Sequence, residues 1–373
     1  MTRTIKLFAR SYLLFSALLA VLGFTGQAAM ASELPAFTAE DVFEMEYAND
    51  PQVSPDGSRV AYVRTSMDIM TDRGRRTIWV VDTDGGNHRP LVSGSGNFSS
   101  PRWSPSGDRL AYLSNRDGKT QLFVQWLDGG ETAKVTTLPQ SPRSIAWSPD
   151  GTKIAFTRFV PAKPPTLAEM PAKPKGAEWA EPATVVDRMT FRRDGGGYLP
   201  TGNNQVFVVP ADGGTPRQMT FGDYPISGSV SWMPDSQSII FSSNRRENVE
   251  YQPRQNDLFA ASLESGEITQ MTDHAGPESN PAVSPNGRYL AYTSAADTRQ
   301  GYNRADLRVK DLRTGESRSL TANLDRSVSD IQWASDSKNL WISYNDLGMN
   351  RVAEVDLKGK LKQSGAVLGG TAL

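Results

Sequence analysis

Residues able to carry out covalent chemistry are scarce in this sequence. The chain has no cysteine and only two histidines, His88 and His274. A serine nucleophile needs an adjacent base, and an α/β-type hydrolase holds that serine in a Gly-x-Ser-x-Gly turn, which does not occur here. His88 follows a hairpin turn and His274 lies in a polar loop, so we expect both to be solvated loop residues. The sequence therefore predicts no catalytic residue.

Metal and cofactor motifs are equally sparse. Asp82-Thr-Asp-Gly85 resembles the start of a calcium loop, but the further oxygen ligands and the terminal glutamate do not follow. No glycine-rich phosphate loop leads into a helix. We predict no metal site and no cofactor.

Loop residues with a positive charge or an aromatic ring are the remaining candidates for binding. Arg192, Arg193, Tyr198 and Arg245 are predicted to bind substrate, through a peptide carboxylate or carbonyl group. The alternative is that these arginines are ordinary solvated loop charges. Arg245 ends a Ser-Ser-Asn-Arg turn with a counterpart at Ser114-Asn-Arg116, which favours a structural role for it.

The elements that must position these residues come from six copies of one unit. Each copy has an apolar residue, then Ser-Pro-Asp-Gly or a related turn, then a β-rich run. The third residues of the motifs stand at positions 55, 105, 149, 234, 285 and 335, which gives intervals of 50, 44, 85, 51 and 50 residues. The one long interval indicates an insertion, which we place at 159–203 in the third copy, between its second and third strands.

The second copy shows most clearly what each unit forms. Its predicted strands are Pro101–Trp103, Arg109–Leu113, Gln121–Trp126 and Ala133–Thr136, separated by turn signals. Four antiparallel strands per repeat of this length are typical of a β-propeller blade. The predicted fold is an all-β propeller with six visible four-stranded blades. We expect four tryptophans before the turns to pack between neighbouring blades: Trp103, Trp147, Trp232 and Trp333.

The predicted domain organisation has four parts. Residues 1–31 form a signal peptide, with a basic start, an apolar run from Leu13 to Phe24, and Ala29-Met-Ala31 before the cleavage point. A helical segment at 32–48, with Thr38 as the N-cap, precedes the propeller at 49–365. Residues 366–373 would form a connector. Two closures stay open at this point, a ring of six blades or a truncated ring of seven.

Charge and hydropathy restrict the partners and the location. The net charge is −1 and no basic stripe with interleaved aromatic residues occurs, so nucleic acid is not expected as a partner. After signal cleavage no apolar run remains that is long enough to span a membrane. The predicted location is the periplasm or the extracellular medium.

The start of the chain and parts of the third repeat resemble secreted serine peptidases of the prolyl oligopeptidase family, in the dipeptidyl and acylaminoacyl peptidase branch. The residues that carry the resemblance are Thr38-Ala-Glu-Asp41, Asp50-Pro-Gln-Val-Ser-Pro-Asp-Gly-Ser-Arg-Val-Ala-Tyr62, Arg192-Arg-Asp-Gly-Gly-Gly-Tyr198, Gln205-Val-Phe-Val-Val-Pro-Ala-Asp-Gly-Gly214 and Gln218-Met-Thr-Phe-Gly-Asp223. The resemblance implies a propeller that caps a C-terminal α/β-hydrolase domain carrying Ser, Asp and His. That domain is missing from this sequence, so no triad residue is carried over.

Three hypotheses follow. The first is a non-catalytic, substrate-gating propeller of a secreted serine exopeptidase, which meets its peptide substrate through the missing hydrolase domain. The second is a TolB-like periplasmic scaffold for protein partners, although TolB proteins place an α/β domain before the propeller. The third is a propeller enzyme that uses polar residues of the central channel, and the scarcity of histidine argues against it.

Overall fold

The computed structural model describes residues 36–168, 171–180, 183–298 and 300–368, in two separate units that divide after Met45. The predicted signal peptide at 1–31 lies outside the described residues. Within the described part, no helix has the length and the apolar character needed to cross a membrane.

The first unit contains one short helix, α2 (Asp41–Glu44). Its N-cap is Glu40, so the prediction of Thr38 as the N-cap is wrong. Thr38 instead donates its backbone N–H to the Asp41 carboxylate at 2.6 Å. The acid in the first turn of the helix thus accepts a hydrogen bond from an exposed amide that precedes the helix. The helix is short because extended structure already begins at Glu46.

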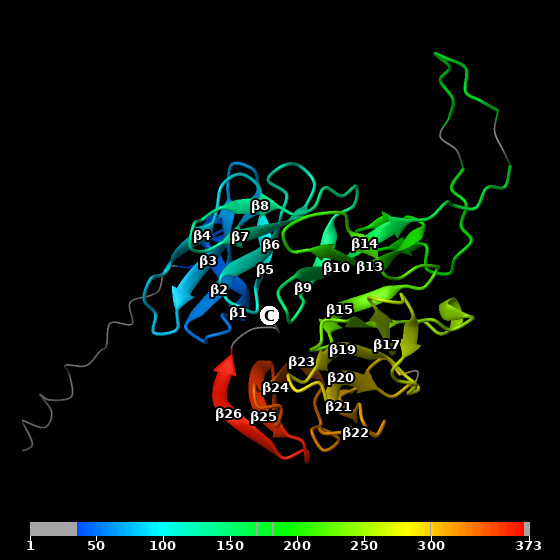
Figure 1. The fold of residues 1–373 in the computed structure, drawn as a ribbon. Helices are drawn as coiled ribbons and strands as arrows, with labels where there is room; N and C mark the ends of the chain where they lie inside the picture. The colour runs from blue at the N-terminus through cyan, green and yellow to red at the C-terminus, as the bar shows by residue number, and fades with distance from the viewer. Residues whose placement is uncertain (1–35, 169–170, 181–182, 299, 369–373) are drawn as a thin grey trace, which may run out of the picture. The chain divides into compact units, whose positions relative to one another are not determined.

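The second unit consists of six four-stranded antiparallel blades (Figure 1). The first three are β1 (Glu46–Val53), β2 (Arg59–Asp68), β3 (Arg73–Asp82) and β4 (Arg89–Val92); β5 (Phe98–Trp103), β6 (Arg109–Ser114), β7 (Gln121–Trp126) and β8 (Thr132–Lys134); β9 (Pro142–Trp147), β10 (Lys153–Pro161), β13 (Gly202–Pro210) and β14 (Arg217–Gln218). The last three are β15 (Ile226–Trp232), β16 (Ser238–Ser243), β17 (Asp257–Ser262) and β18 (Ile268–Gln270); β19 (Glu278–Val283), β20 (Tyr289–Ala295), β21 (Ala305–Asp311) and β22 (Ser317–Ser319); β23 (Val328–Trp333), β24 (Asn339–Asp346), β25 (Met349–Asp356) and β26 (Leu361–Leu368).

The all-β propeller predicted from the repeats is thus confirmed. The predicted connector begins inside the outermost strand of blade six, because β26 runs to Leu368. The insertion of blade three leaves after β10 and returns at β13, and it contains the small hairpin β11 (Arg192–Arg193) and β12 (Gly197–Tyr198).

The Ser-Pro-Asp-Gly turn joins the first two strands of a blade. In blade one the backbone N–H groups of Ser54 and Gly57 close the turn, and Gly57 has φ +73°. The Ser54 hydroxyl donates to Asp56 at 2.5 Å and accepts the backbone N–H of Arg59 at 2.9 Å. The hydrogen bond from Ser54, together with that from Ser58, lowers the pKa of Asp56 to about 2. The motif is therefore a hydrogen-bonded corner that sets the strand register.

The predicted packing of tryptophans between blades is confirmed. Each indole Nε1–H donates to a backbone carbonyl on the first strand of the preceding blade, always at the residue before its last. The four pairs are Trp103 to Gln52 at 2.9 Å, Trp147 to Arg102 at 2.9 Å, Trp232 to Ala146 at 3.1 Å and Trp333 to Ala282 at 2.9 Å. One polar bond thus links each of these inner strands to its neighbour.

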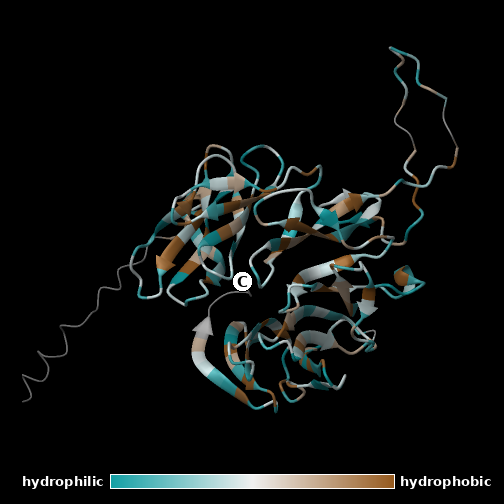
Figure 2. Ribbon diagram, viewed as in Figure 1, coloured by the Kyte–Doolittle hydropathy of each residue, from teal (hydrophilic) through white to brown (hydrophobic). Residues whose placement is uncertain are grey.

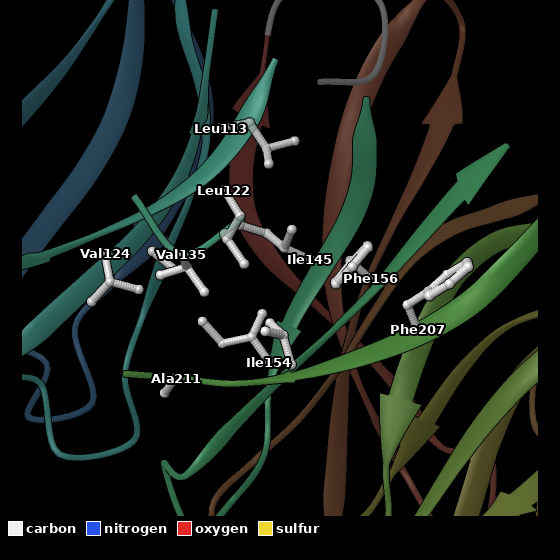
Figure 3. Close-up of a cluster of buried hydrophobic side chains, with 11 residues drawn as sticks. Leu113, Leu122, Val124, Val135, Ile145, Ile154, Phe156, Phe207 and Ala211 are labelled. Atoms are coloured by element: carbon white, nitrogen blue, oxygen red, sulfur yellow. The ribbon is translucent and has the colours of Figure 1, made fainter. Parts of the chain in front are cut away.

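Five clusters of buried hydrophobic side chains lie between consecutive blades. Strongly hydrophobic residues occur along the strands of every blade (Figure 2). The cluster between blades two and three is drawn in Figure 3, where Leu113 and Leu122 approach Ile145 and Phe156. Burial of such faces is the main stabilising contribution expected for this architecture.

Blades one and six each keep one face without a neighbouring blade. No buried cluster within the described residues joins the two. The second strands of blades two, four and five are almost wholly buried, whereas those of blades one and six alternate between buried and less buried residues. Val53 is 60% exposed and Trp341 is 41% exposed. The six described blades therefore do not share a sixth hydrophobic interface.

We expect Trp147→Phe to lower the free energy of unfolding by about 1–3 kcal/mol, because the Arg102 carbonyl loses its partly buried donor. The matched control is Trp341→Phe, since that indole lies on the exposed face of blade six; its expected effect is within about 0.5 kcal/mol. Urea unfolding of the two variants tests the prediction. Equal losses of stability would contradict a specific role for the bond between blades.

The exposed faces of blades one and six are expected to make the 373-residue chain self-associate, because apolar faces and unpaired strand edges promote association. Val53→Lys combined with Trp341→Lys is expected to shift the chain toward the monomer without lowering its melting temperature. Light scattering across a concentration series measures this. A wild-type chain that stays monomeric at every concentration would refute the prediction.

Candidate functional site

The insertion of blade three carries three of the four predicted binding residues. It projects from the blade as the long green segment of Figure 1. In its hairpin Arg192 pairs with Tyr198, and Arg193 pairs with Gly197. All three predicted side chains are exposed, and the Tyr198 ring lies 6.2 Å from the Phe191 ring. The hairpin therefore displays two guanidinium groups and an aromatic pair to solvent.

Polar contacts tie the base of this insertion to blade four. Arg188 forms an ion pair with Asp223 at 3.1 Å, and Asn203 donates to the same carboxylate at 2.6 Å. The backbone N–H of Met189 donates to Glu250 at 3.2 Å. These contacts attach the returning end of the insertion to the segments that precede β15 and follow β16.

Arg245 occupies a different environment from the hairpin residues. It follows β16, and its guanidinium carbon lies 4.4 Å from the Tyr224 ring centroid and 5.5 Å from that of Phe259. Burial lowers its pKa. Its Nη1 is buried and has no hydrogen-bond partner in the described part of the chain.

The stacking of Arg245 repeats in other blades. Arg64 lies 4.4 Å above Trp79, Arg116 lies 4.2 Å above Phe123, and Arg158 lies 4.2 Å above Phe207. Each aromatic ring belongs to the third strand of its blade. Arg245 thus has the same packing role as its counterpart Arg116, in addition to any role in binding.

The structure brings the four predicted residues to two neighbouring places rather than one. Arg188 at the base of the insertion pairs with Asp223, while Arg245 stacks on the next residue, Tyr224. Between the described residues no hydrogen bond or ion pair connects the hairpin side chains to Arg245. The hairpin and the surroundings of Arg245 are therefore two separate candidate binding sites.

Glu278 is a functional candidate that the sequence analysis missed. It begins the inner strand of blade five, where the corresponding strands of blades two, four and six begin with the buried residues Phe98, Ile226 and Val328. Glu278 is wholly buried, and neither carboxylate oxygen has a hydrogen-bond partner of good geometry among the described residues. The signal was present in the repeat, because Glu278-Ser-Asn-Pro aligns with Phe98-Ser-Ser-Pro.

Burial is the main reason that the pKa of Glu278 rises to about 7, and the nearby Thr272 hydroxyl opposes the rise. Buried Asp257 also has its pKa raised by burial, while Arg246 acts in the opposite direction. Two acids thus lie at the contact between blades four and five, beside a hydrophobic cluster that consists of only four fully buried side chains. Part of this contact is polar.

The two histidines lie apart from these groups. His88 is exposed, with its Nε2 2.6 Å from the Tyr62 hydroxyl and its ring against Trp79. His274 is exposed in the loop after β18. In the part of the chain that the structure describes, neither histidine is hydrogen-bonded to a serine, and no three His, Asp or Glu side chains converge as a metal site would require.

Comparisons with known proteins agree with this architecture. Residues 32–167 match the TolB beta propeller domain family, and residues 177–300 match the dipeptidyl peptidase IV N-terminal region. Dipeptidyl-peptidase 5 of Porphyromonas gingivalis is 26% identical over 87% of this chain and 49% of its own length. An uncharacterized peptidase of Bacillus subtilis, YuxL, is 30% identical over 56% of this chain and 31% of its own length. A solved acylaminoacyl peptidase superposes with a TM-score of 0.67 at 17% identity, covering 86% of this chain and 46% of that one.

Fold and comparisons together define the class of protein as a β-propeller domain of peptidases. Its propeller matches the TolB and dipeptidyl peptidase IV N-terminal propeller families, and the relatives it matches are named peptidases, which confirms the resemblance noted in the sequence. It spans about half the length of the Porphyromonas relative and less of the Bacillus one.

The raised pKa of Glu278 predicts a pH-dependent stability. Between the ordinary value of 4.5 and about 7 the folded chain keeps a proton that the unfolded chain loses, so the free energy of unfolding falls as pH rises through this window. Glu278→Gln should remove the fall and stabilise the protein by up to about 3 kcal/mol above neutral pH. At pH near 4 the two proteins should be equally stable.

Urea unfolding at several pH values tests this prediction, with the exposed Glu264→Gln as the matched control. A Glu278→Gln variant whose stability follows the wild-type pH profile would show that Glu278 is not the titrating group.

Proposed function

We propose that this chain is the non-catalytic, substrate-gating propeller of a secreted or periplasmic serine exopeptidase. The observation that carries the proposal is the assembly of inner strands, tied by indole–carbonyl bonds at four of the five contacts between consecutive blades, in a chain related along 87% of its length to a dipeptidyl-peptidase. A rigid framework of this kind excludes folded proteins and admits extended peptides. Hydrolysis is assigned to an α/β-hydrolase domain of the intact protein.

The inner strands support this role through a repeated irregularity. Their pairing with the second strand shifts register near the middle, and a residue with positive φ stands there in five blades: Asp50, Ser100, Ser144, Gly228 and Asn280. The first strands lie on the inner side of the arrangement of blades (Figure 1). Neighbouring irregularities contact each other, as in the Asp50–Arg102 ion pair at 2.9 Å and the Ser144–Gly228 hydrogen bond at 3.3 Å. The inner lining is thus polar and fixed, which suits passage of a peptide backbone.

The gating role is tested on the intact peptidase that contains this propeller. We expect wild-type enzyme to cleave a short peptide and to spare the same sequence within a folded carrier protein. Trp147→Phe combined with Trp232→Phe, which loosens two blade contacts, should increase cleavage of the carrier relative to the peptide, with Trp341→Phe as the control. Equal exclusion of the carrier by all three proteins would count against gating.

A chain without catalytic groups should be inert toward active-site probes. We expect the purified 373-residue chain not to react with a fluorophosphonate and not to hydrolyse dipeptidyl or acyl-peptide substrates. A whole serine peptidase of the same family is the positive control. Stoichiometric labelling of one serine in the chain would overturn the prediction.

The match of residues 32–167 to the TolB propeller family favours one other candidate, a periplasmic scaffold that binds folded protein partners. The same carrier experiment separates the two proposals. A scaffold binds a folded partner whether or not the blade contacts are loosened, and it confers no size selection on hydrolysis.

A further inference from the structure

A cavity of about 370 Å³ lies in blade four beside Arg245. Arg245 and Arg246 enter it from the loop after β16, and Asp257 and Phe259 from β17. Ile268 and Gln270 of β18 complete the lining. The cavity therefore has two cations, one acid and an apolar wall formed by Phe259 and Ile268.

The charges of this lining do not balance. Arg246 pairs with Asp257 at 3.2 Å, which leaves the guanidinium of Arg245 without a carboxylate partner among the described residues. Arg245 Nη1 is a buried donor without an acceptor, and Asp257 Oδ1 is a buried acceptor without a donor. Buried polar groups are normally hydrogen-bonded, because leaving one unpaired is costly. The pocket thus lacks one anion and one nearby N–H or O–H donor.

Blades two and three contain a stacked arginine and a residue equivalent to Asp257 that have a structural role only. They repeat the stacked arginine, but their third strands carry Gln121 and Gln205 at the position that Asp257 occupies in blade four. The Gln121 amide accepts from the Thr136 hydroxyl and donates to the Leu138 carbonyl. Gln205 makes the corresponding bonds to Thr220 and Gly222. Both amides are satisfied within the blade.

Blade four departs from this pattern in two linked ways. An acid replaces the glutamine, as Asp306 also does in blade five, and a second arginine follows the stacked one, whereas Asp117 follows Arg116 in blade two. Neither change is needed for the stack itself, since blades two and three form it without them. The departure points to a ligand.

We propose that this pocket binds an α-carboxylate flanked by an N–H group, as in the C-terminal residue of a peptide or a free amino acid with an apolar side chain. Arg245 and Arg246 receive the carboxylate, Asp257 Oδ1 accepts the adjacent N–H, and the side chain lies against Phe259 and Ile268. Arginine suits this role because its planar guanidinium matches carboxylate geometry. The proposal does not depend on the gating function, since it concerns binding by this chain alone.

Calorimetric titration of the 373-residue chain with four small molecules tests the ligand chemistry. N-acetyl-L-leucine and L-leucine carry both the carboxylate and the N–H group, L-leucinamide lacks the carboxylate, and 4-methylpentanoate lacks the N–H group. We expect the better of the first two to bind at least about tenfold more tightly than either incomplete molecule. Tighter binding of N-acetyl-L-leucine identifies a peptide C-terminus as the source, and tighter binding of L-leucine identifies a free amino acid.

Variants then locate the binding. Arg245→Gln should weaken the better ligand at least about tenfold, and Asp257→Asn should weaken it to a smaller extent. Arg116→Gln is the matched control, because it removes the equivalent stacked arginine of blade two, which is not part of the cavity. Arg245→Lys keeps the positive charge and should retain part of the affinity if Arg245→Gln proves unstable in a thermal melt. Undetectable binding of all four molecules, equal binding of L-leucinamide, or equal losses in the Arg245 and Arg116 variants would overturn the proposal.

Discussion

The contact between consecutive blades is the interaction on which the rest of this structure depends. A four-stranded sheet of this size has two apolar faces and cannot bury both alone, so each blade requires a neighbour on either side. The indole of Trp147 and its three counterparts add a directional bond to this nonspecific burial. Each bond joins a side chain of one blade to the backbone of the inner strand in the preceding blade. It therefore fixes the position of one inner strand relative to the next along the strand direction.

Repetition makes departures from the pattern informative. A position that is apolar in several blades and acidic in one is under a different constraint in that blade. Glu278 replaces an apolar residue at the start of an inner strand, and Asp257 replaces a glutamine at the start of a third strand. Both lie at blade four or its contact with blade five, where the hydrophobic cluster is small. The polar side chains of this region reduce the apolar burial that the other contacts between blades retain, as expected where binding rather than stability constrains a residue.

The base of the insertion of blade three contacts segments that flank the strands of blade four. Its base is held by Asp223 and Glu250, which flank the strands of blade four, while its hairpin presents Arg192, Arg193 and Tyr198 to solvent. The match of residues 177–300 to the dipeptidyl peptidase IV N-terminal region places these surfaces on a propeller of the kind found in peptidases. Under the proposed gating function the propeller selects and orients peptides, and rigid blades with variable loops are suited to that task.

The sequence by itself determined the blade, the number of visible repeats and the resemblance to peptidase propellers. These follow from local signals, since the Ser-Pro-Asp-Gly turn and the β-rich run after it are encoded within a few residues, and Trp103 and its counterparts recur at one position in the repeat. Only the tertiary structure decided what depends on neighbours. Thr38 proved not to be the N-cap, Arg245 was separated from the hairpin residues, and the faces of blades one and six were found without a common core. Burial of Glu278 and the unpaired atoms around Asp257 arise where two blades meet, because desolvation is a property of the packed interface and not of the strand that carries the residue.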